Sequence, residues 1–560
     1  MREVIETSVE RFGNNIAFTL KLSEGNYRDI TYIRFYGEIL CLGETMIEEG
    51  IAGEAIGFFG KNSYPWFLAH LATQFSGGIS VMLDKEFPRD ELISSLKRTG
   101  TTVIFYDSKE RDLVLDVMAS GETDLKHAYP LYECEGETDI YDLIAKGKAL
   151  IDASSDTRIE KIELDPDRVS HYFFTSGTTS QSKIVMLSQW NISSNTLNMC
   201  DVEPFSEHDT TIMLLPYHHT FGSGAQWVVL ASGGRTTYCD GLKYFQKNMQ
   251  EYGVSFFVGV PLIVESMYQK IMKTAEKEGL DGRIRTFSKI VRGLKKAHID
   301  IRRTVFKGVL DALGGKLRFV IIGASAADPE VIQGFNDFGV LCVQGYGLTE
   351  TSPVLIAERE THRRRGSIGI TMQGVETDLI DVDENGVGEI IARGDNVMKG
   401  YLNDQESTDA MIKDGWIHTG DLARRDADGY YYITGRKKNV IVLKNGKNVS
   451  PEELESRIAK LPYALENIVV GLPNNGNEKD LVIMLKLVYD PEYAEFKGKS
   501  KEEIEAVVNA DIEKLNDEIQ NYKHIKRIFV TDEPMEKTST QKVKKYIEIE
   551  KMKAADIVIS

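Results

Sequence analysis

Short apolar runs bounded by glycine or polar residues recur through the first 350 residues of the chain. They cover residues 55–60, 79–84, 102–106, 172–174, 211–215, 256–258 and 319–323. Continuous apolar runs of this length are typical of strands that are buried on both faces of a sheet. Helical patterns lie between them, such as residues 90–97, in which Leu92, Ile93 and Leu96 share one face. The alternation predicts an α/β fold whose large N-terminal domain has mostly parallel sheets flanked by helices.

The pattern changes at about residue 366, where glycine and aspartate become frequent. Short alternating runs at residues 388–394 and 429–435 are typical of antiparallel strands joined by tight turns. We therefore expect a small β-barrel-like subdomain over residues 366–435. It would end an N-terminal domain that covers residues 1–435.

A third pattern covers residues 436–560. Ser450 predicts a helix start, because serine is a preferred N-cap, Pro451 suits the first helical position and Glu453 can close a capping box. Strand candidates flank a charged helix, at residues 468–470, 481–487 and 525–530 around residues 501–520. This predicts a small α+β C-terminal domain.

Composition narrows the class of protein. With 560 residues, 42% of them hydrophobic and 27% charged, the chain can form two or more domains with a buried core. Its formal net charge of −18 would repel nucleic acid, so no nucleic-acid partner is expected. The five cysteines lie at least 39 residues apart, and there is no signal-peptide pattern and no run of about 18 apolar residues. We expect a soluble cytoplasmic protein with reduced thiols.

A loop rich in hydroxyl groups and glycine follows the apolar run at residues 172–174. Its candidate phosphate ligands are Thr175, Ser176, Gly177, Thr178, Thr179 and Lys183. Backbone N–H groups, several hydroxyl groups and one cation suit a polyphosphate. The loop lacks the GxxxxGK[ST] pattern of a Walker A loop, and a polar surface turn is the alternative for a generic loop of this kind.

A second motif, residues 344–353, follows the apolar run at residues 340–343. It is therefore expected at the carboxyl edge of the sheet, where open α/β sheets bind ligands. Tyr346 can stack on a base, and Thr349 and Glu350 can reach phosphate and a hard cation such as magnesium. A third motif, residues 416–422, presents Asp421 in a predicted glycine turn, where it can accept hydrogen bonds from a ribose diol. A plain Asx turn is the alternative for Asp421.

Five motifs occur in the order and spacing of the adenylate-forming superfamily of AMP-binding enzymes. They are residues 175–183, 346–350, 419–421, 435–436 and 537–542. The chain thus resembles acyl-CoA synthetases, luciferases and the adenylation enzymes of peptide synthetases. It is most similar to bacterial long-chain fatty acyl-CoA synthetases, whose hinge segment resembles residues 438–453.

The resemblance implies a two-step reaction with ATP, magnesium (Mg2+) and coenzyme A. The carboxylate of a fatty acid attacks the α-phosphate of ATP, which gives an acyl-adenylate and pyrophosphate. The thiol of coenzyme A then displaces AMP. Cations close to the reacting oxygens would neutralise the charge that develops on the phosphate.

The resemblance also implies a role for each motif residue. The β- and γ-phosphates would be held by Thr175, Ser176, Gly177, Thr178, Thr179 and Lys183. Tyr346 would stack on the adenine, Asp421 and Arg436 would bind the ribose, and Gly345 would also contact ATP. The remaining residues would act at the reacting groups or move the C-terminal domain: Thr349 at the phosphate, Glu350 as the magnesium ligand, Lys542 as the catalytic lysine and Lys438 as the hinge.

An acyl pocket is implied in the same way. His219 would be a catalytic residue beside the acyl chain, and Gly323, Ala324 and Ser325 would lie between the adenine and the acyl group. The adjacent His218 and His219 suggest a metal site at first sight. Neighbouring side chains on a strand point to opposite faces, so no metal is expected at these histidines.

Departures from the family pattern leave alternatives open. In the phosphate loop, Ser180, Ser182 and Ile184 stand where the family usually has glycine, proline and glycine, and Gln541 replaces the glycine before the terminal lysine. One alternative is therefore a catalytically weak paralogue that binds acyl or adenine ligands. Another is a ligase that delivers the acyl group to a separate acyl carrier protein.

A strongly basic segment covers residues 283–318. It contains eleven lysine or arginine residues and two acidic residues, a local balance of +9. Three interpretations are a solvated helical face, peripheral contact with anionic membrane lipid, and steering of the phosphates of ATP and coenzyme A. The sequence is also compatible with a homodimer.

Overall fold

The structure, a computed structural model, describes residues 1–154, 157–175, 182–444, 447–474, 477–537 and 543–559. The chain forms two compact units. Unit 1 consists of Met1–Thr377, Ala392–Ile417 and Asp428–Tyr431, and unit 2 of Asp378–Ile391, His418–Ala427 and Tyr432–Ser560. The expected domain boundary at residue 435 stays a prediction.

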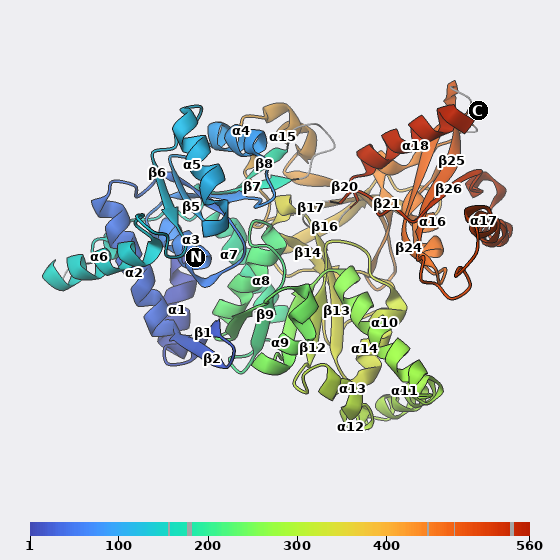
Figure 1. The fold of residues 1–560 in the computed structure, drawn as a ribbon, viewed down its shortest axis with the longest axis horizontal. Coiled ribbons are helices and arrows are strands. Elements are labelled where there is room, and N and C mark those ends of the chain that lie inside the picture. The colour runs from blue at the N-terminus through green and yellow to red at the C-terminus, as the bar shows by residue number, and fades with distance from the viewer. Residues whose placement is uncertain (155–156, 176–181, 445–446, 475–476, 538–542, 560) are drawn as a thin grey trace. The chain divides into compact units, whose positions relative to one another are not determined.

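Unit 1 contains a nine-stranded mixed sheet (Figure 1). Its strands run in the order β15 (Ile370–Thr371), β14 (Val354–Ala357), β13 (Leu341–Gly347), β12 (Phe319–Ile322), β11 (Phe256–Gly259), β9 (Thr210–Met213), β10 (Arg235–Tyr238), β1 (Ile16–Ser23) and β2 (Asn26–Thr31). The strands from β13 to β1 are parallel to their neighbours, and the strands at both edges are antiparallel.

A second sheet of unit 1 has seven strands. Their order is β18 (Gly400–Tyr401), β8 (Lys183–Ser188), β7 (Val169–Thr175), β4 (Ile79–Leu83), β3 (Ala55–Phe59), β5 (Val103–Tyr106) and β6 (His127–Pro130). The strands from β7 to β6 are parallel, whereas β8 is antiparallel to both β7 and β18. Each of the seven apolar runs noted in the sequence lies in one of these two sheets, which confirms the predicted strands.

Helices flank both sheets (Figure 1). Their bounds are α1 (Arg2–Phe12), α2 (Tyr32–Glu48), α3 (Tyr64–Phe75), α4 (Arg89–Thr99), α5 (Arg111–Ser120), α6 (Ile140–Ser154), α7 (Gln189–Val202), α8 (Thr220–Ala231), α9 (Phe245–Tyr252), α10 (Pro261–Lys277), α11 (Asp281–Lys296), α12 (Arg302–Val305), α13 (Lys307–Ala312), α14 (Pro329–Phe338) and α15 (Gln405–Met411). Every residue of α3 is buried. The main core contains Phe67 of α3 and Trp227 of α8 together with Phe58 and Phe256, one from each sheet. The predicted α/β fold is confirmed.

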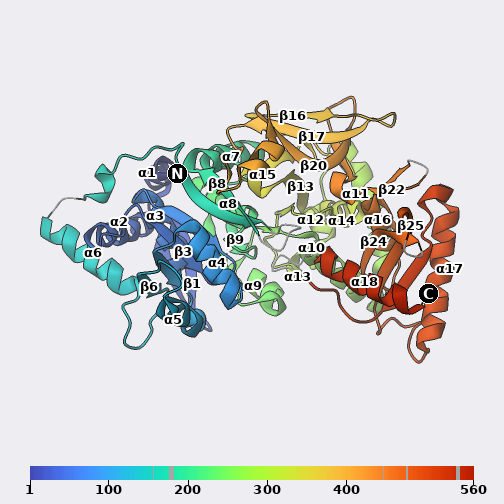
Figure 2. The same cartoon turned by 90° about the horizontal axis from the view of Figure 1, so that it is seen from above.

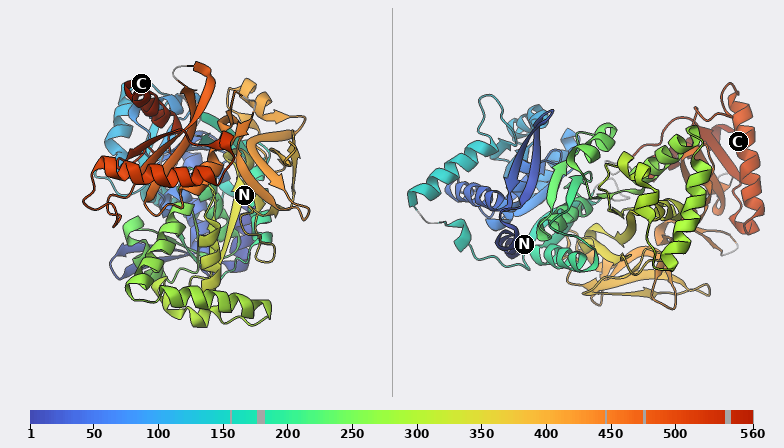
Figure 3. Two further views of the ribbon diagram at one scale, coloured as in Figure 1. Left: turned by 90° about the vertical axis from the view of Figure 1, so that its right-hand side faces the viewer. Right: turned by 90° about the horizontal axis from the view of Figure 1, so that it is seen from below.

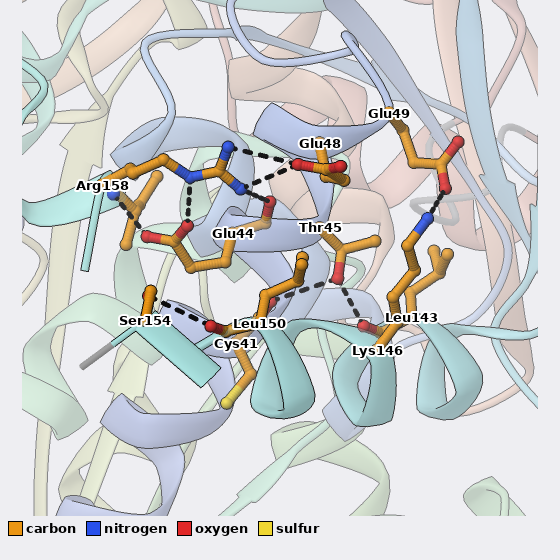
Figure 4. Close-up of polar contacts among 11 residues, drawn as sticks. Cys41, Glu44, Thr45, Glu48, Glu49, Leu143, Lys146, Leu150, Ser154 and Arg158 are labelled. Atoms are coloured by element: carbon orange, nitrogen blue, oxygen red, sulfur yellow. Dashed lines mark hydrogen bonds and ion pairs between the residues drawn. The ribbon is translucent and has the colours of Figure 1, made fainter. Parts of the chain in front are cut away.

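Helices α2 and α6 approach each other closely (Figure 4). A Cβ atom on Gly147 of α6 would lie 1.7 Å from the carbonyl oxygen of Cys41 in α2, so only glycine fits there. The Thr45 hydroxyl donates to the carbonyl of Leu143 at 2.6 Å. Beside this contact, the buried Glu44 carboxylate accepts a hydrogen bond from Arg158 Nε at 2.9 Å.

Unit 2 contains a three-stranded sheet with helices on both faces (Figure 2). Its elements are β24 (Ala464–Asn474), β25 (Asn477–Tyr489), β26 (Arg527–Thr531), α16 (Pro451–Ile458), α17 (Lys501–Asp517) and α18 (Lys545–Ile559). Val508 of α17 packs in a cluster with Val469 and Leu485, and Met552 of α18 packs in another with Val470 and Met484. Adjacent strand residues thus face opposite helices, as the pleat requires.

The start of α16 differs from the predicted capping box. Ser450 is the N-cap residue, and Pro451 begins the helix. The Ser450 hydroxyl donates to the carbonyl of Thr434 at 2.5 Å rather than accepting from the helix. The prediction of a capping box is therefore wrong, because a tertiary contact uses the hydroxyl.

A small sheet is formed within the predicted β-rich segment. Its five strands are β16 (Val375–Ile380), β17 (Val387–Gly394), β19 (Ile412–Lys413), β20 (Trp416–Arg425) and β21 (Tyr431–Arg436). The alternating run at residues 388–394 lies in β17, and residues 431–435 of the second run lie in β21. All five cysteines are free thiols. Among the described residues, no helix combines the length and apolar character needed to cross a membrane.

Candidate active site

The predicted phosphate loop connects two antiparallel strands. Thr175 ends β7, Lys183 begins β8, and the two residues are paired across the ladder. Arg98 Nη1 donates to the carbonyl of Ser182 at 2.8 Å, which ties the second strand to α4. The hairpin therefore determines where Thr175 and Lys183 lie. The predicted ligands Ser176, Gly177, Thr178 and Thr179 and the departure at Ser180 lie outside the described residues.

Lys183, Tyr401 and Glu350 come together in unit 1. Lys183 Nζ lies 4.8 Å from the centre of the Tyr401 ring, and the Tyr401 hydroxyl donates to Glu350 Oε1 at 2.7 Å. Strand β18 carries Tyr401 to this position, because it pairs with β8 immediately beyond Lys183. Burial, and then the Glu350 carboxylate, raise the pKa of Tyr401. The phenol is thus a hydrogen-bond donor that orients the carboxylate.

Tyr401 was not among the residues singled out in the sequence. Its signal is the pair Gly400-Tyr401, which follows an apolar residue, Met398, at the edge of the β-rich segment. Nothing in that pair indicates its partners. Only the pairing of β18 with β8 brings the phenol to Glu350.

The segment that carries Glu350 is held by buried polar contacts. Asn195 of α7 bonds to both backbone groups of Val354, at 2.7 and 3.1 Å. Asn396 Nδ2 donates to the carbonyl of Thr351 at 2.8 Å, and the Thr351 hydroxyl donates to the carbonyl of Pro353 at 2.6 Å. These bonds give Glu350 a defined position at the end of β13.

Tyr346 and Thr349 lie at the end of β13 and in the turn that follows it. Tyr346 is near the carboxyl end of β13, where it pairs with Ile356, and Thr349 begins the short 3-10 turn after that strand. Both are partly exposed, so each can meet a ligand. Gly347 between them must be glycine, since a Cβ atom would lie 1.8 Å from the carbonyl oxygen of Pro353.

The predicted acyl-pocket residues lie directly after β12 and at the start of α8. Gly323 is buried, and a Cβ atom there would lie 2.6 Å from the ring of Phe221. Ala324 adopts φ +71° and is exposed, as is Ser325. His219 is the N-cap residue of α8.

The two histidines do not lie on a strand. Strand β9 ends at Met213, and His218 and His219 lie in the turn before α8. Their ring centres are 4.4 Å apart. The expectation that their side chains point to opposite faces is therefore wrong, because the backbone of a turn does not alternate as a strand does.

The predicted ribose residues pair with each other in unit 2. Arg436 Nε donates to Asp421 Oδ1 at 2.5 Å, and the Asp421 carboxylate is almost fully buried. Asp421 lies within strand β20 and not in a turn, so the predicted glycine turn is wrong. Gly420 adopts φ +70° inside that strand, which explains why the sequence resembles a turn.

The predicted hinge residue also belongs to unit 2. Lys438 is exposed in the 3-10 turn Lys437–Asn439 that follows β21. Lys437 is bound by Glu389, at 2.8 Å, and Asp381. The predicted catalytic residue Lys542 and the departure Gln541 lie outside the described residues.

The basic segment 283–318 is only partly a solvated face. Several of its arginines support the fold, since Arg292 pairs with the buried Asp337 at 2.6 Å and Arg303 donates to the carbonyl of Leu317 at 2.8 Å. Lys295 and Arg302 line a cavity of about 320 Å³, together with other basic residues. Desolvation, followed by the nearby arginines, lowers the pKa of Lys295.

Comparison with known proteins supports one family. Residues 5–402 match the AMP-binding enzymes, and residues 438–554 match the C-terminal domain of AMP-binding enzymes. Long-chain-fatty-acid–CoA ligase 5 of Rattus norvegicus is 27% identical over 91% of this chain and 80% of its own length. Long-chain-fatty-acid–CoA ligase FadD15 of Mycobacterium bovis is 24% identical over 96% and 93%. A chloroplastic long-chain-fatty-acid–[acyl-carrier-protein] ligase of Arabidopsis thaliana, AEE15, is 24% identical over 84% and 74%.

Solved structures share the fold. The anthranilate CoA ligase AuaEII in complex with anthranoyl-AMP has a TM-score of 0.79 and 19% identity, over 99% of this chain and 97% of that one. ATP-bound MatB from Rhodopseudomonas palustris has a TM-score of 0.77 and 21% identity, over 98% of both chains. The matched residues cover most of both units, and the fold agrees along the whole chain. The protein therefore belongs to the AMP-binding enzymes, the adenylate-forming superfamily that its motifs resemble.

Proposed function

We propose that the protein is an ATP-dependent acid:thiol ligase. It activates a long-chain fatty acid as an acyl-adenylate and transfers the acyl group to coenzyme A, releasing AMP and pyrophosphate. The observation that carries the proposal is the arrangement of Lys183, Tyr401 and Glu350 in a chain of this family. A cation and an oriented carboxylate beside a phosphate loop suit a reaction whose main cost is charge at phosphorus.

The chemistry of Glu350 fits Mg2+. The ion prefers oxygen ligands, and the Tyr401 hydroxyl orients the carboxylate through one of its two oxygens. Bound Mg2+ would neutralise charge on the phosphates of ATP. Lys183 would do the same from the protein side together with the loop that begins at Thr175, and Thr349 would contact the phosphate. Tyr346 would stack on the adenine.

Unit 2 supplies the other proposed groups. The paired Asp421 and Arg436 would bind the ribose, with the Asp421 carboxylate accepting from the two hydroxyl groups. Lys542 would bridge the acyl carboxylate and the α-phosphate during adenylation. Because the thiol must later reach the same carbonyl, we expect residues 436–560 to swing about Lys438 between the two steps.

The proposal of a long-chain fatty acid as the acyl substrate is supported by relatives of the chain. Relatives from rat and Mycobacterium bovis that carry the name long-chain-fatty-acid–CoA ligase support a long acyl chain. His219 and the segment Gly323–Ser325 would line its pocket. Transfer to an acyl carrier protein is the second candidate, favoured by the Arabidopsis relative named for that acceptor.

The test is acid-dependent exchange of labelled pyrophosphate into ATP over acids from acetate to oleate. Exchange should be greatest with long chains and should collapse in Lys542→Ala. Lys544→Ala is the matched control, since it removes the same charge two residues away and should leave exchange unchanged. Product formation with coenzyme A or with an acyl carrier protein then distinguishes the two acceptors.

Two results would contradict the proposal. No exchange with any acid would favour a paralogue that binds acyl or adenine ligands without catalysis. Exchange only with short or aromatic acids would keep the adenylating activity and refute the long-chain substrate.

The surface of α11 supports peripheral contact with membrane lipid. This helix lies at the edge of unit 1 (Figure 3). Its exposed lysines and arginines lie beside Phe287 and Ile290, which are 44% and 47% exposed. Basic and apolar side chains on one helix suit an anionic lipid surface, from which a fatty acid could be drawn.

A further inference from the structure

We propose that Asp84, His218 and His219 form a binding site for a divalent transition-metal ion of the Zn2+ class. Each residue offers one ligand atom, and the three atoms all lie within 4.8 Å of one another. Imidazole nitrogen suits zinc, copper and nickel, whereas magnesium prefers oxygen. The site is therefore distinct in both residues and chemistry from the proposed magnesium ligand Glu350.

The fold brings the three residues together from both large sheets of unit 1. Asp84 directly follows β4, and the two histidines lie in the turn between β9 and α8. Asn62 holds this turn, because its amide donates to the carbonyl of Leu215 at 2.7 Å and accepts from the backbone of Tyr217 at 2.8 Å. The positions of the ligands are thus set by hydrogen bonds that do not involve a metal.

His218 carries the strongest evidence for a ligand. Its side chain is 4% exposed, and its Nε2 atom has no hydrogen-bond partner among the described residues. Buried polar atoms normally have such a partner, so an unsatisfied imidazole nitrogen requires an explanation. Asp84 Oδ1 lies 3.5 Å from that nitrogen. Two ligand atoms of a tetrahedral zinc ion are separated by about 3.3 Å, so the pair needs little movement to bind one.

A backbone hydrogen bond also orients the Asp84 carboxylate. Its Oδ1 atom accepts a hydrogen bond from the backbone N–H of Glu86 at 3.0 Å. Such outer contacts are typical of metal ligands and fix the direction of the coordinating oxygen. Three protein ligands leave a fourth position for water or an exogenous group, which is the arrangement of exchangeable zinc sites.

A metal ion at this site would affect binding of the fatty acid, an expectation that rests on the proposed function. His219 is a proposed acyl-pocket residue, so a metal bound to it would exclude the acid. We expect Zn2+ to inhibit adenylation in competition with the fatty acid and not with ATP. Metal binding itself is measured without either substrate, so its failure and the failure of the proposed function are distinguishable.

The experiment is a titration of the full, metal-free chain with Co2+, followed by visible absorption. The intense bands of tetrahedral Co2+ should appear with one ion per chain and should vanish when Zn2+ is added. His218→Ala should weaken binding at least about 100-fold, since it removes a ligand and even outer contacts are worth 10- to 100-fold. His208→Ala is the matched control, because this exposed histidine lies ten residues away.

A second variant distinguishes the loss of a metal ligand from misfolding of the chain. Asp84→Asn keeps the shape of the side chain and removes its charge, and it should also weaken binding. The proposal is overturned if the unsubstituted chain gives no tetrahedral spectrum. It is equally overturned if both variants bind Co2+ as tightly as the unsubstituted chain, because the metal would then be held by other residues.

Discussion

At the scale of the residue, the hydrogen bond from the Tyr401 hydroxyl to Glu350 can be removed without deleting the ring. Tyr401→Phe keeps the ring beside Lys183 and deletes the hydrogen bond to Glu350. A hydrogen bond to a charged group contributes about 1.5–3 kcal/mol, so we expect pyrophosphate exchange to fall about 10- to 100-fold. Tyr546→Phe, at an exposed position, should have no effect. An unchanged rate in Tyr401→Phe would show that the carboxylate needs no orientation.

The candidate site residues differ in whether a sequence motif indicates them. Lys183, Tyr346 and Glu350 were predicted as site residues because their motifs have an order and spacing that few other chains share. Tyr401 has no such motif, and its partners come from strands far apart in the chain. The same is true of Asp84, whose neighbours His218 and His219 lie more than 130 residues away in sequence.

At the scale of the element, Arg158 binds two acidic residues of α2, Glu44 and Glu48. Glu44 is buried, and Arg158 and the backbone of Ile159 are its hydrogen-bond donors among the described residues. Arg158→Ala would leave a buried carboxylate with one donor, which should destabilise unit 1 by about 2 kcal/mol. The measurement is urea unfolding. Lys148→Ala removes an exposed helix pair with Asp152 and should cost less than about 0.5 kcal/mol.

If Arg158→Ala and Lys148→Ala lowered the free energy of unfolding equally, the prediction would be contradicted. The carboxylate of Glu44 would then be stabilised by solvent rather than by Arg158. Figure 4 shows why we expect otherwise, since Arg158 reaches both Glu44 and Glu48 from one side.

The basic helix α11 gives a second prediction at this scale. A test of lipid contact should avoid Arg302 and Arg303, because both donate to backbone carbonyls and support the fold. The exposed basic residues suitable for replacement by glutamine are Arg283, Arg285, Lys289 and Lys296. At about 1 kcal/mol for each charge near an anionic surface, the fourfold variant should bind anionic vesicles about 4 kcal/mol more weakly.

Vesicle sedimentation measures this effect. The control variant replaces four exposed lysines of unit 2, namely Lys460, Lys497, Lys499 and Lys501. It changes the net charge equally and should bind vesicles as the unsubstituted chain does. If both variants bind alike, α11 is a solvated face.

At the scale of the whole molecule, two buried histidines make stability depend on pH. Burial lowers the pKa of His70 to about 3 and the pKa of His171 well below its ordinary value. Both are neutral in the folded protein, whereas the unfolded chain takes up protons below pH 6.5 or so. Their contribution to stability is therefore present above that pH and is lost as the pH falls. Between pH 7.5 and 5, His70 should account for a loss of about 2 kcal/mol in the free energy of unfolding.

Two buried carboxylates act in the opposite direction. Burial raises the pKa of Glu203 to about 8 and that of Glu358 to about 7. The folded protein keeps these protons up to a higher pH than the unfolded chain does. The stability that the two carboxyl groups contribute is therefore present at low pH and is lost as the pH rises through those values. The net pH dependence of the unsubstituted chain is a balance of both pairs.

A comparison of variants separates the two effects. The free energy of unfolding in urea at pH 7.5 minus that at pH 5 should fall by about 2 kcal/mol in His70→Asn. His208→Asn, at an exposed position, should leave it unchanged. If His70→Asn keeps the full pH dependence, the imidazole is protonated in the folded state.

The amino-acid sequence alone was sufficient for the α/β class, the strands of the parallel sheets and the family of AMP-binding enzymes. These follow from local patterns of apolar residues and from motifs of contiguous residues, which do not depend on distant parts of the chain. Tertiary structure decided which distant groups meet: Tyr401 with Glu350, Ser450 with Thr434, and Asp84 with His218. It also placed Asp421 in a strand and the paired histidines in a turn. Such contacts depend on how strands and helices pack, and no local pattern specifies that packing.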